Sequence, residues 1–133
     1  MASLVEKIKS LSQSLAQETV GNRHHLHMHP ELSFQETATQ VFVEKQLNAW
    51  GISTSRLANT GVVAIIEGKN PNKKVVALRA DMDALPIIET NDVPYKSQNS
   101  GVMHACGHDV HTSSLLGTAH ILQSIKDEFE GSV

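Results

Sequence analysis

Cysteine and aromatic residues are scarce in this sequence: 133 residues include one Cys, one Trp, one Tyr and three Phe. A single cysteine cannot form a disulfide within the chain, which excludes a small disulfide-stapled scaffold and leaves Cys106 as either buried filler or a chemical group. No apolar run approaches about 18 residues, and the N-terminus lacks a basic region followed by an apolar stretch. We therefore expect a cytoplasmic protein without a membrane partner.

An excess of basic residues is also missing. Eleven Lys and Arg residues stand against fourteen Asp and Glu residues, and the basic ones are scattered along the chain. This pattern provides no electrostatic footprint for nucleic acid. With 40% hydrophobic residues, the chain has the composition of one globular domain, or of part of one.

Helix signals dominate both ends of the chain. Ser3 and Glu6 form a capping-box pattern that predicts a helix running to about Pro30, with a possible break near Gly21. A second capping-box pattern begins a helix at residues 33–36. That helix should end at Gly51, and a last one is predicted after Gly107. The apolar face of the last helix would contain Leu115, Ala119 and Leu122.

The middle of the chain has the pattern of short strands. Residues 52–57, 62–68 and 75–82 are joined by short turns, which predicts a three-stranded antiparallel meander. Two of these runs are continuously apolar, so we expect helices on both faces and an α/β fold, a three-layer sandwich with a mixed sheet. Residues 83–105 form a long loop, and the final Ser-Val resembles the start of another strand, which suggests a fragment.

Cys106 and His108 are the sharpest candidates for chemistry. A thiolate and an imidazole one residue apart, in a loop that enters a helix, can face one point, and both bind zinc and similar metals. The alternative is a buried Cys beside a capping His, and spacing alone does not decide. A cysteine protease is disfavoured because a nucleophile and its base usually come from distant segments.

Other polar residues are further candidates. His111 lies one helical turn after His108 and is a third ligand, a substrate contact or an ordinary polar residue. Asp81 and Asp83 point to one side of an extended chain, either toward a pocket or as loop caps paired with Arg79. His25 and His29 are also one helical turn apart, and there the interaction with the helix C-terminus is the favoured role.

Three stretches taken together resemble a known family: "RHHLHMHPELSFQE", "LRADMDALPI" and "MHACGHDVHT", in this order. They are similar to the start of the M20 metallopeptidase family, in its amidohydrolase branch of hippurate hydrolases, N-acyl-amino-acid amidohydrolases and auxin-conjugate hydrolases. Three ordered motifs of this length are far more specific than any one of them.

The resemblance implies that Cys106 and His108 are ligands of a two-metal centre, with the thiolate bridging both ions. Mn or Zn is expected, and Co or Ni is possible. The general base of the family is a Glu on the strand after this helix, which would lie beyond Val133. The implied activity is hydrolysis of the amide bond of N-acyl amino acids or related conjugates by metal-activated water.

Other implications concern the remaining site and the assembly. Asp81 and Asp83 match a carboxylate element of the family that orients ligands, and His111 matches a position near the substrate. Residues 1–133 would be the N-terminal portion of the catalytic domain, without its remainder and without the lid domain through which relatives form homo-oligomers. Such a fragment alone should be inactive.

A different class of function uses the same residues. Cys106, His108 and His111 could form the complete site of a small metal-binding or redox-sensing module. A nonfunctional truncation with an exposed sheet edge is a third possibility. Tight binding of one zinc ion that depends on His111 would distinguish the module from the hydrolase.

Overall fold

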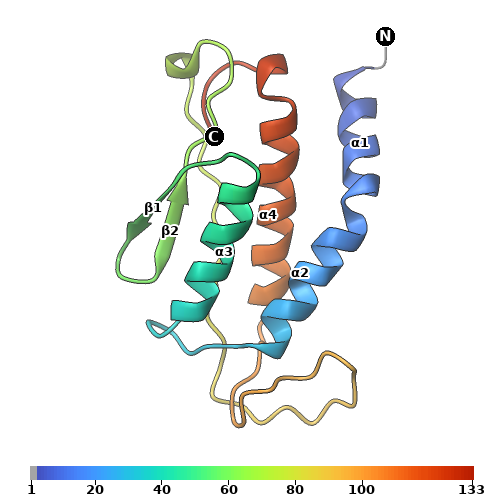
Figure 1. The fold of residues 1–133 in the computed structure, drawn as a ribbon, viewed down its shortest axis with the longest axis vertical. Helices are drawn as coiled ribbons and strands as arrows, with labels where there is room; N and C mark the ends of the chain where they lie inside the picture. Colours follow the sequence, from blue (N-terminus) through green and yellow to red (C-terminus); the bar gives the residue numbers. More distant parts are fainter. Residues whose placement is uncertain (1–2) are drawn as a thin grey trace.

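The computed structural model describes residues 3–133, whose main elements are four α-helices and one β-hairpin. The helices are α1 (Leu4–Ser14), α2 (Ala16–Met28), α3 (Thr37–Ala49) and α4 (His108–Ser124), the strands are β1 (Thr54–Leu57) and β2 (Gly61–Ala64), and short 3-10 turns span Pro71–Lys73 and Lys126–Glu128. Figure 1 shows α2 and α3 on either side of α4, with the hairpin next to α3.

The N-terminal helix begins as the sequence predicts. The Ser3 hydroxyl accepts the N–H of Glu6 at 3.2 Å, and the Glu6 carboxylate accepts the N–H of Ser3 at 2.8 Å, so the capping box is confirmed. The helix breaks at Leu15 rather than at Gly21, which lies inside α2. As expected, α2 ends just before Pro30.

The start of α3 differs from the prediction. The capping box expected at residues 33–36 is not formed, because Phe34 has a left-handed φ of 63° and the helix starts only at Thr37. Glu31 caps the helix instead: its two carboxylate oxygens accept the N–H groups of residues 38–39 at 3.1 and 2.7 Å. A carboxylate in this position satisfies two of the donors that a helix leaves free at its N-terminus.

The predicted hairpin of β1 and β2 is confirmed, with Leu57 opposite Gly61 in register. Ala58 and Asn59 have positive φ values of 52° and 68°, the conformation that a tight hairpin turn requires. Gly61 is needed here because a Cβ atom would lie 2.6 Å from the Leu57 carbonyl oxygen.

The third strand of the predicted meander is not formed. Residues 75–82 do not pair with β2; instead the C-terminal segment 129–133 lies between residues 66–69 and 74–76. Ser132 forms an antiparallel bridge to Glu67 and a parallel bridge to Val75, so the pairing is mixed. The final residues do pair as a strand would, as the sequence suggests.

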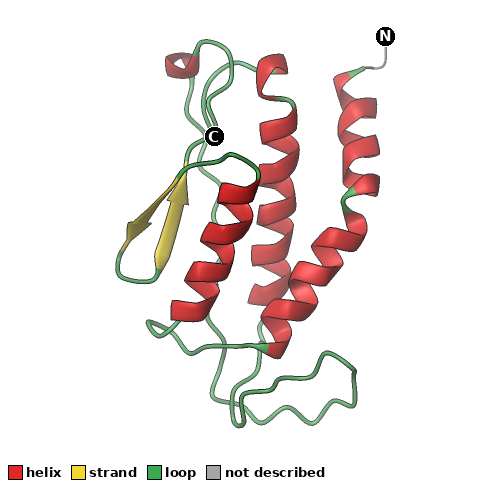
Figure 2. Ribbon diagram, in the orientation of Figure 1, coloured by secondary structure: helices red, strands yellow, loops and turns green. Residues whose placement is uncertain are grey.

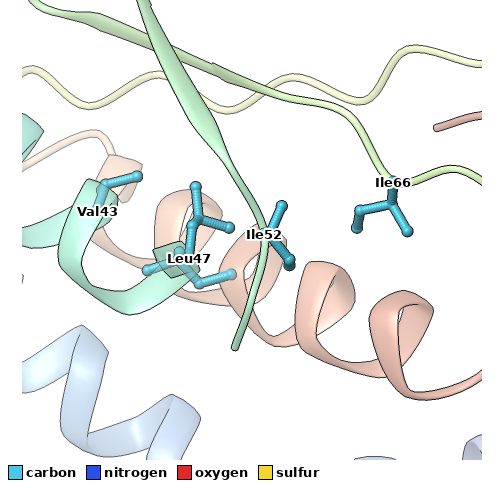
Figure 3. Close-up of a cluster of buried hydrophobic side chains, with 5 residues drawn as sticks. Val43, Leu47, Ile52 and Ile66 are labelled. Atoms are coloured by element: carbon cyan, nitrogen blue, oxygen red, sulfur yellow. The ribbon is translucent and has the colours of Figure 1, made fainter. Parts of the chain in front are cut away.

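The hydrophobic core lies between the hairpin, α3 and α4. Figure 3 labels four of its side chains, and the complete cluster is Val43, Leu47, Ile52, Ile66 and Leu116. Leu116 is 3% exposed, whereas Ala119 and Leu122 of the predicted face are only partly buried against this core.

The prediction that both faces of the strands are covered is wrong for the described residues, because Val63, Ile65 and Val75 are exposed. The mixed helix-and-strand class is confirmed, and the three-layer arrangement stays a prediction.

The long loop is confirmed. Residues 77–107 contain no helix or paired strand, only isolated bridges. Figure 2 shows this loop at the end of the molecule where α2 ends and where α3 and α4 begin. Within residues 3–133, no helix is long and apolar enough to cross a membrane.

Candidate metal centre

Gly107 turns the long loop into α4. Its φ of 82° lies in the left-handed region that favours glycine, and the N–H groups of Val110 and His111 donate to its carbonyl at 3.0 and 3.1 Å. The Thr112 hydroxyl donates to the backbone carbonyl of Asp81 at 2.8 Å. This bond fastens the 81–83 segment along the first turns of α4.

His108 is held from one side by Asp83. Its Nδ1 lies 2.9 Å from both the backbone oxygen and the carboxylate Oδ1 of Asp83. Both oxygens only accept, so Nδ1 carries a hydrogen, and in the neutral ring the lone pair lies on Nε2. Among residues 3–133, no hydrogen bond engages Nε2. This is the arrangement of a metal-binding histidine whose second nitrogen donates to a carboxylate.

Cys106 precedes His108 by two residues and is an exposed cysteine outside any disulfide. It is not buried filler, which was the alternative interpretation. A thiolate sulfur and an imidazole nitrogen suit zinc and related borderline metals, so the two side chains fit such an ion chemically. They supply two ligands, which is fewer than a closed site requires.

His111 and Asp81 are less closely associated with this pair. The His111 ring is exposed, and its centroid lies 5.6 Å from that of His108. The Asp81 carboxylate forms an ion pair with Arg79, whose side chain is 81% exposed. Within the described part of the chain, no three His, Cys, Asp or Glu side chains are placed to hold a metal. A complete site from Cys106, His108 and His111 is therefore not favoured.

A cluster of charged side chains next to His108 was not predicted from the sequence. Its members are Arg23, His27, Glu89 and Asp109. His27 contacts both carboxylates, with Nδ1 2.7 Å from Asp109 and Nε2 3.0 Å from Glu89. Only the place of Asp109 directly after His108 gave a sequence signal for this cluster.

Hydrogen bonding sets the charge of Glu89. Burial alone would raise the pKa of its carboxyl group, but hydrogen bonds from His27, the Ser97 N–H and Asn91 outweigh burial and lower it. The Ser97 N–H donates to Glu89 at 2.7 Å. Glu89 is therefore a carboxylate that also fastens the long loop.

Three other histidines, His25, His29 and His104, do not join the candidate site. His25 stacks on Phe42 with a centroid distance of 4.2 Å and lies 4.8 Å from the His29 ring, and burial and His29 together lower its pKa. Burial also lowers the pKa of His104, whose two ring nitrogens have no partner among residues 3–133. The structural role predicted for His25 agrees with its stacking.

Comparison with known proteins gives consistent matches. Residues 77–133 match the model of peptidase family M20/M25/M40. The chain is 49% identical over 129 residues to an N-acyl-L-amino acid amidohydrolase of Geobacillus stearothermophilus, covering 96% of this chain and 35% of the relative. It is 45% identical over 132 residues to thermostable carboxypeptidase 2 of Saccharolobus solfataricus, covering 98% and 33%.

One solved structure has a backbone similar to that of this chain. The YXEP protein of Bacillus subtilis, described as a dinuclear metal-binding peptidase of the M20 family, superimposes with a TM-score of 0.84 at 42% identity, over 91% of this chain and 34% of that one. The chain thus spans about a third of the length of these relatives. Together, the three ordered motifs, the matched family model and the similar backbone show that this chain resembles about a third of the length of peptidases of the M20 family.

Proposed function

We propose that this chain supplies part of the metal centre of an amidohydrolase. The observation that carries the proposal is the His108 ring, fixed by Asp83 with its Nε2 unengaged, beside the exposed thiol of Cys106. The relatives support the reaction class, since those compared are an amidohydrolase, a carboxypeptidase and a metal-binding peptidase.

Cys106 and His108 would hold the metal, and Asp83 would orient His108. Divalent ions bound there would polarise the amide carbonyl of the substrate and acidify water. Two ions are proposed by analogy with the dinuclear Bacillus subtilis protein, with Mn or Zn expected and Co or Ni possible. The general base is expected outside residues 1–133, as the family resemblance implies.

The proposed substrates are N-acyl amino acids or related amides, after the Geobacillus stearothermophilus relative. We also propose that residues 1–133 correspond to the N-terminal part of a catalytic domain whose full protein is a homo-oligomer. His111 remains a candidate substrate contact, and the cytoplasmic location stays a prediction.

A chimera tests the activity. Residues 1–133 would replace the matching third of the Geobacillus stearothermophilus amidohydrolase, and hydrolysis of N-acetyl amino acids would be measured with added Zn or Mn. We expect turnover in the chimera, a loss of at least about 100-fold in Cys106→Ala and His108→Ala, and none by the 133-residue chain alone. A folded, metal-loaded chimera whose turnover survives both substitutions would refute the proposal.

A further inference from the structure

We propose that His27 and Arg23, both on α2, are positioning residues for the metal ligands, because they hold Asp109 and with it the first turn of α4. This inference rests on the proposed metal role of Cys106 and His108. His27 and Arg23 themselves would touch neither metal nor substrate.

Asp109 is the point of attachment. It directly follows His108 and is 1% exposed. Its Oδ2 lies 2.7 Å from Nδ1 of His27 and 2.9 Å from Nε of Arg23. A hydrogen bond with His27 and an ion pair with Arg23, both from α2, therefore hold one buried oxygen at the start of α4.

The first turn of α4 is consequently held on two sides. Successive side chains of a helix point about 100° apart, so His108 and Asp109 leave the backbone in different directions. Asp83 holds the first and His27 holds the second. Rotation of this turn would break one of the two contacts, so the pair restricts where Nε2 of His108 can point.

His27 also joins α4 to the long loop. Its Nε2 lies 3.0 Å from Glu89, a 6%-exposed residue whose other oxygen accepts the Ser97 N–H. Nδ1 and Nε2 of His27 thus face two buried carboxylates, one from α4 and one from the long loop. A side chain at position 27 that cannot reach both would leave a buried carboxylate without one of its partners.

The test is a Co²⁺ titration of the 133-residue chain. Binding is monitored by the thiolate-to-cobalt absorption of Cys106 in the near ultraviolet. We expect His27→Gln to weaken Co²⁺ binding about tenfold or more, as the loss of a group that orients ligands does in other metal sites. Glu89→Gln is the matched control: it disturbs the same buried cluster but leaves the contact between His27 and Asp109. It should stay within about threefold of the unsubstituted chain.

Equal Co²⁺ affinity in His27→Gln and the unsubstituted chain would overturn the inference, and so would equal weakening in Glu89→Gln. If His27→Gln does not fold, Arg23→Gln replaces it, since Arg23 is partly exposed, and a loss of threefold or more is expected.

Amide hydrogen exchange provides a readout that needs no metal. The N–H groups of Val110 and His111 should exchange faster in His27→Gln than in Glu89→Gln. If neither the unsubstituted chain nor the chimera that carries it gives thiolate absorption, the proposed metal site fails. Amide exchange then decides whether His27 holds the first turn of α4. Equal exchange rates in His27→Gln and Glu89→Gln would refute this role of His27 as well.

Discussion

Nδ1 of His108 lies 2.9 Å from Oδ1 of Asp83, although the two residues are 25 positions apart in the sequence. The long loop between them returns to the same point, so that a carboxylate from its start meets the first residue of α4. The contact fixes the imidazole ring and leaves the opposite nitrogen available to a metal.

The first prediction concerns this contact. Asp83→Asn should weaken Co²⁺ binding by the 133-residue chain about tenfold, because a neutral amide orients and polarises the ring less well than a carboxylate. Asp81→Asn is the control, since its side chain pairs with the exposed Arg79 and should change affinity by less than about twofold. Equal losses of Co²⁺ affinity in the two variants would contradict this prediction. They would show that a nearby negative charge, and not the orientation of His108, determines the affinity.

The cap of α3 gives a second prediction. Glu31→Ala should lower the free energy of unfolding by about 1 kcal/mol, because two N–H groups of the helix lose their acceptor. Ser33→Ala, which removes the residue that the sequence pattern favoured, should change it by less than about 0.5 kcal/mol. Urea unfolding of both variants checks this. A larger loss of stability in Ser33→Ala than in Glu31→Ala would instead support the capping box predicted from the sequence.

The core provides a third prediction. Leu116→Ala should cost about 2–5 kcal/mol of unfolding free energy, since the side chain is 3% exposed and its removal leaves a cavity. Leu57→Ala is the same substitution at a residue that is 65% exposed, and it should cost less than about 1 kcal/mol. Similar urea midpoints for the two variants would contradict the assignment of the core.

The fourth prediction concerns acid stability. Hydrogen bonds from His27 and Ser97 lower the pKa of Glu89 below its ordinary value of 4.5, so the folded chain favours the carboxylate. This contribution is present above pH 4.5 and is lost as the pH falls through the folded pKa. Glu89→Gln should therefore lose less stability than the unsubstituted chain between pH 5 and about pH 3. If the urea midpoints of Glu89→Gln and the unsubstituted chain fell in parallel across this range, the result would contradict a lowered pKa of Glu89.

Local patterns were predictable where the interacting groups are near in sequence. Ser3 and Glu6 cap each other within one turn, and the turn at residues 58–60 has its own conformational signature. The cap of α3 was missed because Glu31 lies seven and eight residues before the N–H groups it accepts. No short capping pattern covers that separation.

Longer separations explain the other differences. The expected third strand was displaced because segment 129–133 competes for residues 66–69, and only the folded chain brings them together. His27 meets Glu89 and Asp109 across 62 and 82 positions. The metal ligands were easier to propose, because Cys106 and His108 are neighbours in one motif.

The central claim is that Cys106 and His108 bind the same ion, and Co²⁺ titration of the 133-residue chain tests it most directly. We predict a thiolate-to-cobalt band that disappears in Cys106→Ala, and that needs at least about tenfold more Co²⁺ in His108→Ala, with folding unchanged in both. Absence of the band from both the chain and the chimera that carries it, or a band whose Co²⁺ dependence is the same without the His108 imidazole, would contradict the account.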